Sequence, residues 1–383
     1  MSEWKEYILE QVIDKFIDYR GKTPTKTLSG IPLVTAKIVK TGRIEQPNEF
    51  IAKQDYETWM TRGFPEVNDV VLTTEAPLGE VALIKDKNIA LAQRIITLRT
   101  KSALCNSVFL KYYLQSDIGQ NLLQARASGS TVEGIKSAEL KKMGISLPSL
   151  KVQNSIAEIL SSLDDKIDLL HRQNKTLEQM AETLFRQWFV EEAGDSGFTT
   201  LSHYSDNVRE NVSIGDLCKF ENYIGLEHVP QKTVTISSWG SPIGLASNKS
   251  AFKKNDILFG KLRSYFHKVV FAPVDGVCST DILVIRPKKP EWFSFCLFWF
   301  FNKEVVDYSD LSSGGTRMPR TSWELISQYE IPIPDEEAIV KFESIVRPII
   351  EKMTGASQQI NALTQLRDLL LPKLMSGEIA VVN

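Results

Sequence analysis

The sequence contains few of the residues on which most catalytic and metal sites depend. It has only four histidines and four cysteines among 383 residues. No CxxC pair occurs, and no cysteine or histidine stands at metal-ligand spacing from another. This excludes the common zinc patterns and favours buried, reduced thiols in a cytoplasmic protein. The cysteines are Cys105, Cys218, Cys278 and Cys296.

Long apolar runs and a strong net charge are also lacking. The longest apolar run, residues 292–301, is too short to span a bilayer and predicts a buried helix or strand. The first residues show no basic-then-apolar signal region, which again favours the cytoplasm. With a net charge of −2 and 43% hydrophobic residues, any basic surface for nucleic acid has to be local.

Motifs that bind nucleotides or activate a nucleophile are missing. The sequence has no GxGxxG, GxxxxGK[ST] or GxSxG. The triplet at 139–141 has the Glu-x-Lys form of some nuclease sites, but such triplets are common by chance. Residues 164–166 lie off the apolar side of a predicted helix, so we interpret them as solvated. We therefore predict no catalytic residue and no metal site.

The most regular stretch is a long helix, predicted for residues 148–190. Apolar residues recur at alternating steps of three and four, the pattern of a coiled-coil seam. The single polar member, Asn174, is of the kind that fixes helix register at some cost in stability. About 40 helical residues make a rod of about 60 Å, which needs a partner. The seam residues are Leu160, Leu163, Ile167, Leu170, Asn174, Leu177, Ala181 and Leu184.

A second helix with the same pattern, predicted for residues 335–383, supplies that partner. Adding 186 to the seam positions gives apolar residues again, with Arg367 as the exception. Pro348 and Gly355 lie within this helix, so we expect a kink or hinge there. The seam of the second helix comprises Val346, Ile349, Met353, Ala356, Ile360, Leu363, Arg367 and Leu370.

The duplication extends upstream of both helices. Residues 68–72 match 255–259, and residues 95–99 match 282–286, both at an offset of 187. Each matching segment reads as a strand followed by turn residues, which predicts an α+β domain. The chain is thus divided into a globular domain (1–147), a long helix (148–190), a linker (191–211), a second globular domain (212–334) and a second long helix (335–383).

The two globular domains differ where their scaffolds match. Residues 74–80 correspond to residues 261–267, and the second segment has three basic residues where the first has two acids. Five basic residues against one acid lie between Ala251 and Ala272. Such a segment suits contacts to phosphates and base edges. It could equally be an exposed turn that keeps a strand edge soluble.

A polar loop precedes each helix, at residues 128–136 and 312–320. Small hydroxyl residues and a cation let a backbone approach a phosphate closely, although a simple connector would look similar. These two signals, with polar residues from neighbouring segments, give a set of candidate contacts to nucleic acid in each domain, chosen on chemistry and not on a motif. The candidates are Thr74, Arg94, Ser130, Thr131 and Lys136 in the first domain, and Lys261, Arg263, Tyr265, Ser279, Thr280, Thr316 and Arg317 in the second.

At this point the chain resembles a known family over essentially its whole length, the DNA-specificity subunits of type I restriction-modification enzymes. The resemblance rests on the duplicated order of domain and helix, and on short segments at the helix ends. These segments are Leu-Pro-Ser-Leu at 147–150, Ile-Ala-Glu-Ile-Leu at 156–160, Leu-Phe and Trp-Phe at 184–189, and Leu-Leu-Pro-Lys-Leu at 370–374.

The resemblance implies that DNA recognition and catalysis belong to different subunits. Each globular domain would be a target-recognition domain reading one half of a bipartite, asymmetric DNA sequence. The helices would pair antiparallel and set the gap between the half-sites, and their outer surfaces would bind two methyltransferase subunits. Those partners would bring S-adenosylmethionine for adenine methylation, and restriction subunits would bring ATP and Mg. This chain would hold no cofactor and would be non-catalytic. We expect Ile156, Ile159 and Phe185 to lie on the outer helix surfaces.

Two other functions compete with this interpretation. A nuclease acting alone would need a cluster of metal-binding carboxylates, which the sequence does not supply. A coiled-coil scaffold that joins proteins without reading DNA would explain the helices. It would leave the basic segment and the divergence of the two domains unexplained.

Overall fold

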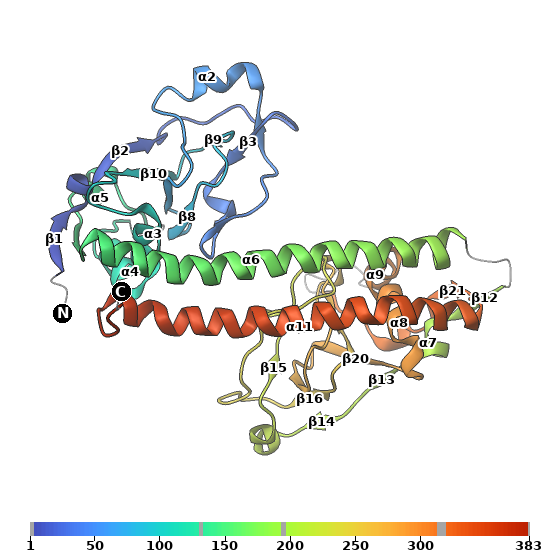
Figure 1. Ribbon diagram of the computed structural model, residues 1–383. Helices are drawn as coiled ribbons and strands as arrows, with labels where there is room; N and C mark the ends of the chain where they lie inside the picture. Colours follow the sequence, from blue (N-terminus) through green and yellow to red (C-terminus); the bar gives the residue numbers. More distant parts are fainter. Residues whose placement is uncertain (1–3, 130–132, 193–196, 312–318, 382–383) are drawn as a thin grey trace. The chain divides into compact units, whose positions relative to one another are not determined.

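The computed structural model describes residues 4–129, 133–192, 197–311 and 319–381. The chain forms two compact units: unit 1 comprises Met1–Asp165 and Leu366–Asn383, and unit 2 comprises Lys166–Gln365. The long helices α6 (Leu150–Arg186) and α11 (Glu336–Met375) each contribute residues to both units (Figure 1).

Unit 1 is built on an antiparallel sheet of order β2-β10-β7-β8, with a smaller sheet β6-β3-β9 and the pairs β4–β5 and β1–β11. Its strands are β1 (Lys5–Ile8), β2 (Ile13–Asp18), β3 (Ile31–Val34), β4 (Val39–Lys40), β5 (Arg43–Ile44), β6 (Phe50–Ile51), β7 (Val70–Thr74), β8 (Leu78–Leu83), β9 (Ala90–Leu91), β10 (Ile95–Thr100) and β11 (Gly144–Leu147). Its shorter helices are α1 (Leu9–Val12), α2 (Tyr56–Trp59), α3 (Ser107–Gln115), α4 (Asp117–Gln124) and α5 (Ser137–Lys141).

Unit 2 repeats this plan. Its main sheet has the order β13-β20-β17-β18, beside a sheet β14-β16-β19-β15 and the pair β12–β21. Its strands are β12 (Phe198–Thr200), β13 (Ser205–Val208), β14 (Asn211–Val212), β15 (Tyr223–Ile224), β16 (Lys249–Phe252), β17 (Ile257–Gly260), β18 (Val269–Phe271), β19 (Gly276–Cys278), β20 (Ile282–Pro287) and β21 (Glu330–Pro332). Its shorter helices are α7 (Leu201–Tyr204), α8 (Phe293–Phe301), α9 (Lys303–Leu311) and α10 (Trp323–Ile326).

The structure confirms the duplication predicted from the sequence, and an equivalent ion pair occurs in each unit. In unit 1, Asp69 binds Arg99 through two hydrogen bonds of 2.9 and 2.8 Å. In unit 2, Asp256 binds Arg286 in the same way, at 2.7 and 2.6 Å. Both aspartates are buried at the start of the central strand of their main sheet. A bidentate pair of this kind fixes the strand in register, and it is kept in both units.

The prediction that residues 191–211 form a linker is wrong for most of the residues in this range that the structure describes. Strand β12, helix α7 and strand β13 lie within it. Thr199 pairs with Ile331, and Ser205 is fully buried while pairing with Pro287. Partners more than 80 residues away supply this order, so local polarity and missing periodicity could not reveal it.

In both units α6 and α11 pack antiparallel through the predicted seams. In unit 2, Ile167 and Leu170 share one apolar cluster with Ala356 and Ile360. In unit 1, Leu160 shares a cluster with the last turns of α11. Helix α11 is uninterrupted from Glu336 to Met375, so the hinge expected around residues 348–355 is not a break in the helix.

Most of the remaining seam residues lie in the same apolar clusters. Leu177, Leu184, Val346, Ile349 and Met353 belong to or pack against the core of unit 2. Leu363 packs against the cluster of Ile167, and Leu370 against the core of unit 1. Leu163 is half-buried.

Asn174 is buried in the seam, and its amide is poorly satisfied. Its nitrogen donates to Met353 O and Ser357 Oγ at 3.4 Å each, while its oxygen has no partner among the described residues. An Asn174→Leu variant is therefore expected to gain stability, by about 1 kcal/mol or about 3 °C in melting temperature. Calorimetry should show this rise, and Thr176→Leu, on the exposed face of α6, is the control. A melting temperature below wild type would contradict it.

Four expectations about helix residues outside the seams were wrong. Ile156 and Phe185 are 1% and 2% exposed, because they face the cores of units 1 and 2 respectively. Ile159 is half-buried against the core of unit 1. Asp164 is not solvated: it contacts α3 and α11 of unit 1. Each helix serves a globular core on one side as well as its partner helix, so its buried face is wider than the seam.

Candidate nucleic-acid interface

In unit 2, three segments meet where the central strand β17 ends. The amide of Lys261 donates to Asp281 O at 2.8 Å, and the amide of Thr321 donates to Lys261 O at 3.1 Å. Leu262 forms an isolated bridge with Arg320. We call this meeting point the junction of unit 2. It joins the residue before β20 and the segment before α10 to the end of β17.

Unit 1 has the same junction at the end of β7. The amide of Thr74 donates to Arg94 O at 2.9 Å, and the amide of Ile135 donates to Thr74 O at 3.0 Å. Glu75 forms an isolated bridge with Gly134. These are the residues expected from an offset of 186 or 187. Both candidate polar loops, 128–136 and 312–320, lead directly into their junctions.

The two junctions share a backbone but carry different charges. In unit 1 the Nε of Arg94 lies 2.9 Å from Glu75 Oε1. In unit 2 the equivalent of Arg94 is Asp281, whose Oδ1 lies 3.3 Å from Arg320 Nη2. The scaffold is retained while its side chains differ, with opposite charge at the one aligned position of Arg94 and Asp281, and such differences suit two domains that read different sequences.

A cavity of about 360 Å³ adjoins the junction of unit 2. Lys261, Thr280 and Thr321 line it, together with Arg209 from the end of β13. The Thr321 side chain is 5% exposed, and its Oγ1 has no partner among the described residues. Glu324 also lines the cavity and pairs with Arg209, so the cavity presents groups of both charges and suits a ligand with several hydrogen-bonding groups.

The basic segment 261–267 connects β17 to β18 through a 3-10 turn, Ser264–Phe266. Arg263 and His267 flank the turn with left-handed φ of +51° and +53°. The amide of Arg263 donates to Pro319 O at 2.9 Å, which ties the turn to the segment before α10. Tyr265 is 49% exposed and packs against Phe266. The structure therefore presents an aromatic ring and a cation beside the junction.

Not every basic residue of this region is available to a ligand. The ammonium of Lys268 donates to Leu226 O at 2.5 Å, and burial lowers the pKa of Lys268 below its usual value. His267 Nε2 contacts Phe301 O at 2.7 Å, and burial also lowers the pKa of His267. Both side chains serve the local fold. Fewer basic side chains are thus available to a ligand than the composition of the segment indicated.

The candidate DNA contacts of unit 1 differ in how exposed their side chains are. The Thr74 side chain is fully buried, which argues against the contact with DNA predicted for it. Arg94 is exposed beside that strand, and Lys136 is exposed at the start of α5. Ser130 and Thr131 lie outside the described residues.

In unit 2, Thr280 is exposed, whereas Ser279 Oγ accepts the amide of Asp281 at 3.2 Å and so shapes a turn. Thr316 and Arg317 lie outside the described residues. Sequence reasoning missed Arg320, although an offset of 186 would have aligned it with Gly134. It also missed Arg209, because strand β13 had been assigned to a linker.

Two classes of site find no support in the described parts of the chain. They contain no group of three or more His, Cys, Asp or Glu residues placed to hold a metal ion. Nor do they include a helix long and apolar enough to cross a membrane.

Comparison with known proteins agrees with this assignment. A specificity subunit of the type I restriction enzyme MjaIX from Methanocaldococcus jannaschii is 27% identical over 404 residues, covering 94% of this chain and 90% of that relative. A HindI specificity subunit from Haemophilus influenzae is 26% identical over 335 residues, covering 67% and 73%. The fold is also that of a type I restriction-modification S subunit from M. genitalium, with a TM-score of 0.60, 16% identity and coverage of 97% and 96%.

The family model for the type I restriction modification DNA specificity domain matches twice, at residues 1–179 and 207–365. The two matches cover most of the chain and correspond to its two copies of domain and helix. The protein therefore belongs to the type I restriction modification DNA specificity domain family.

Proposed function

We propose that the two globular domains read the two halves of one bipartite, asymmetric DNA sequence. The observation that carries this proposal is the pair of equivalent junctions whose side chains differ, including one aligned position of opposite charge, Arg94 in unit 1 and Asp281 in unit 2. A duplicated backbone suits the local two-fold symmetry of a DNA duplex. Different side chains on that backbone suit two different half-sites.

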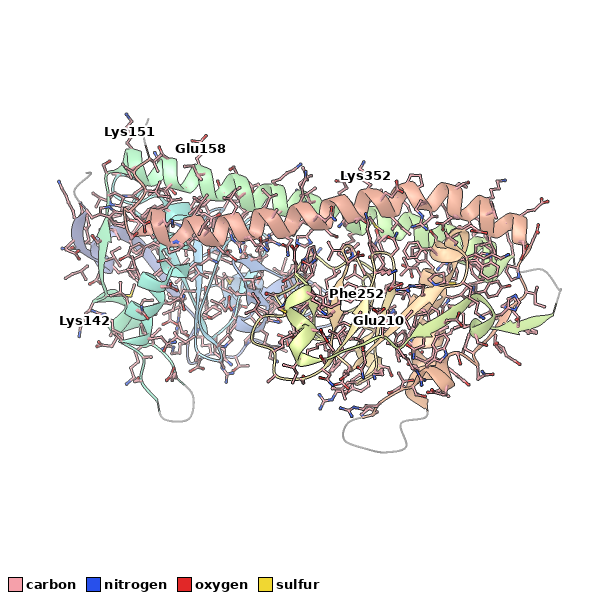
Figure 2. The ribbon with its side chains drawn as sticks, turned by 90° about the horizontal axis from the view of Figure 1, so that it is seen from below. Lys142, Lys151, Glu158, Glu210, Phe252 and Lys352 are labelled. Atoms are coloured by element: carbon pink, nitrogen blue, oxygen red, sulfur yellow. The ribbon has the colours of Figure 1, made fainter. Side chains whose placement is uncertain are left out.

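The helices are proposed to dock two methyltransferase subunits. Their outer faces carry exposed charged residues: Lys151 and Glu158 of α6 point away from the sheets of unit 1, and Lys352 of α11 points away from those of unit 2 (Figure 2). Exposed apolar side chains on α6, Leu169 and Met180, are about half accessible and add area for a partner.

The chemistry is proposed to reside in the partners. Methyltransferase subunits would bind S-adenosylmethionine and methylate adenine, and restriction subunits would use ATP and Mg. This chain would determine which DNA sequence the complex recognises and would supply no catalytic group. DNA and the other subunits of the restriction-modification complex are accordingly its proposed partners.

Single-molecule mapping of methylated adenine in the host genome tests the proposal. We expect a split motif, two short half-sites with a fixed gap, that disappears when this gene is deleted and returns when it is restored. Deleting the partner methyltransferase gene is the positive control, because it should remove the same motif. Unchanged methylation after deletion, with the methyltransferase intact and expressed, would leave a scaffold without DNA readout as the remaining function.

A further inference from the structure

We propose that the arginine–carboxylate pair at each junction reads a guanine–cytosine base pair from the major groove. This inference rests on the proposed function and names the chemistry of its site. The pairs are Arg94 with Glu75 in unit 1, and Arg320 with Asp281 in unit 2.

Both arginines are accessible, and among the residues that the structure describes each pairs with one carboxylate. The side chains of Arg94 and Arg320 are 53% and 64% exposed. Each ion pair engages one guanidinium nitrogen, Nε of Arg94 and Nη2 of Arg320. Since a guanidinium carries five N–H donors in a rigid fork, two parallel donors remain for a ligand in each case.

The backbone holds each pair in place. Arg94 O accepts the amide of Thr74, and Asp281 O accepts the amide of Lys261, so one member of each pair is fixed to the central strand. The partner residues Glu75 and Arg320 are fixed by their bridges to the neighbouring segment. A preorganised pair loses less conformational entropy on binding than two free side chains.

Comparison with the other repeated ion pair argues against a purely structural role. The buried pairs of the two main sheets, Asp69–Arg99 and Asp256–Arg286, occupy equivalent positions in both units. The junction pairs do not, because the position of Arg94 holds an acid in unit 2. Exposed ion pairs contribute only about 0–1 kcal/mol to stability. Stability therefore does not explain why each unit forms such a pair from different sequence positions.

The chemistry of the pair matches one base pair. In the major groove, guanine presents two acceptors, N7 and O6, and the paired cytosine presents the N4 amino donor. Two arginine donors beside a carboxylate acceptor are complementary to this pattern. An A·T pair presents the adenine N7 acceptor, the adenine N6 amino donor and the thymine O4 acceptor. The amino donor would then face an arginine donor and the O4 acceptor would face the carboxylate, so the A·T pair does not match.

The test uses the assembled complex of this chain with its methyltransferase subunits. Methylation rates are measured on a DNA library in which every position of the wild-type motif is varied. The variants are Arg94→Ala and Arg320→Ala, with Glu75→Gln and Asp281→Asn for the carboxylates. Matched controls are Lys26→Ala in unit 1 and Lys219→Ala in unit 2, each from an exposed ion pair that involves no residue of the junction.

Each arginine variant is expected to lose about tenfold or more of the preference for G·C at one position of one half-site. The other half-site should be unchanged, and the carboxylate variant of the same unit should affect the same position. The lysine controls should retain the wild-type motif and rate.

Three results would overturn the inference while leaving the proposed function intact. They are a half-site that contains no G·C pair, an unchanged preference in both arginine variants, or a uniform loss of rate on all sequences, which indicates a phosphate contact. A wild-type complex that methylates no split motif would instead reject the proposed function, and this inference with it.

Discussion

A complex with seven extra residues in α6 and seven in α11 is expected to methylate the same two half-sites across a longer gap. The insertions belong between Asp165 and Lys166 and between Gln365 and Leu366, where both helices pass from one unit to the other. These points face each other, since Arg367 Nη1 lies 2.9 Å from Asp164 Oδ1. Methylation of the original motif should be lost.

The expected change follows from helix geometry. Seven residues add about 10 Å to a helix and preserve the heptad seam. With about 3.4 Å per base pair, the gap should lengthen by at most about three base pairs. Each recognition domain keeps its own junction, so the half-sites should not change.

Mapping of methylated adenine would give both half-sites and the gap in one measurement. A variant with the insertion in α6 alone is the control, because it shifts the two seams against each other and should weaken helix pairing. Finding the original gap in the doubly extended complex would contradict a role of the helices in spacing.

Asp164→Ala is expected to lower the free energy of unfolding by about 3–5 kcal/mol, because it leaves buried cations without their counter-charge. Asp164 accepts hydrogen bonds from Lys111 at 2.7 Å, from Tyr112 at 2.6 Å and from Arg367 at 2.9 Å. Lys111 is 5% exposed. The cluster joins α3, α6 and α11 of unit 1 at a single carboxylate.

The same cluster predicts a pH dependence. Burial raises the pKa of Asp164, but Lys111, Tyr112 and Arg367 together outweigh burial and lower that pKa to about 2. Burial lowers the pKa of Lys111 more than the carboxylate raises it, yet the 2.7 Å contact identifies an ion pair at neutral pH. Because the pKa of Asp164 is depressed on folding, its contribution is complete above the unfolded value near 4 and is lost as the pH falls toward 2.

Thermal unfolding of the purified chain between pH 7 and pH 3 would measure both effects. The melting temperature of Asp164→Ala should lie about 10 °C or more below wild type at pH 7. The acid-dependent contribution of Asp164 is about 2 kcal/mol, so the difference should narrow below about pH 4. Asp165→Ala is the matched control, since Asp165 is exposed and its contact with Lys85 is 3.8 Å. Equal melting temperatures for the two variants would show that the buried cluster is not required.

The sequence was sufficient for features that depend on periodicity and repetition. The heptad spacing around Asn174 identified the face of α6 that packs against α11, because a helix imposes the same geometry wherever it occurs. The offset of 187 residues identified Asp69 and Asp256 as equivalent strand starts, because duplicated backbones keep the residues that fix their register. The family resemblance followed from the order of these elements.

The structure was needed wherever a side chain's environment depends on distant segments. Asp164 appeared solvated by its place on α6, but α3 and the end of α11 cover it. Strand β12 appeared to be linker, because its partner β21 lies more than 100 residues away. Arg320 became a candidate only in the structure, where its guanidinium lies beside Asp281 at the junction. Local sequence encodes helix period and repeat spacing, whereas burial and charge pairing arise from contacts that only the folded chain brings together.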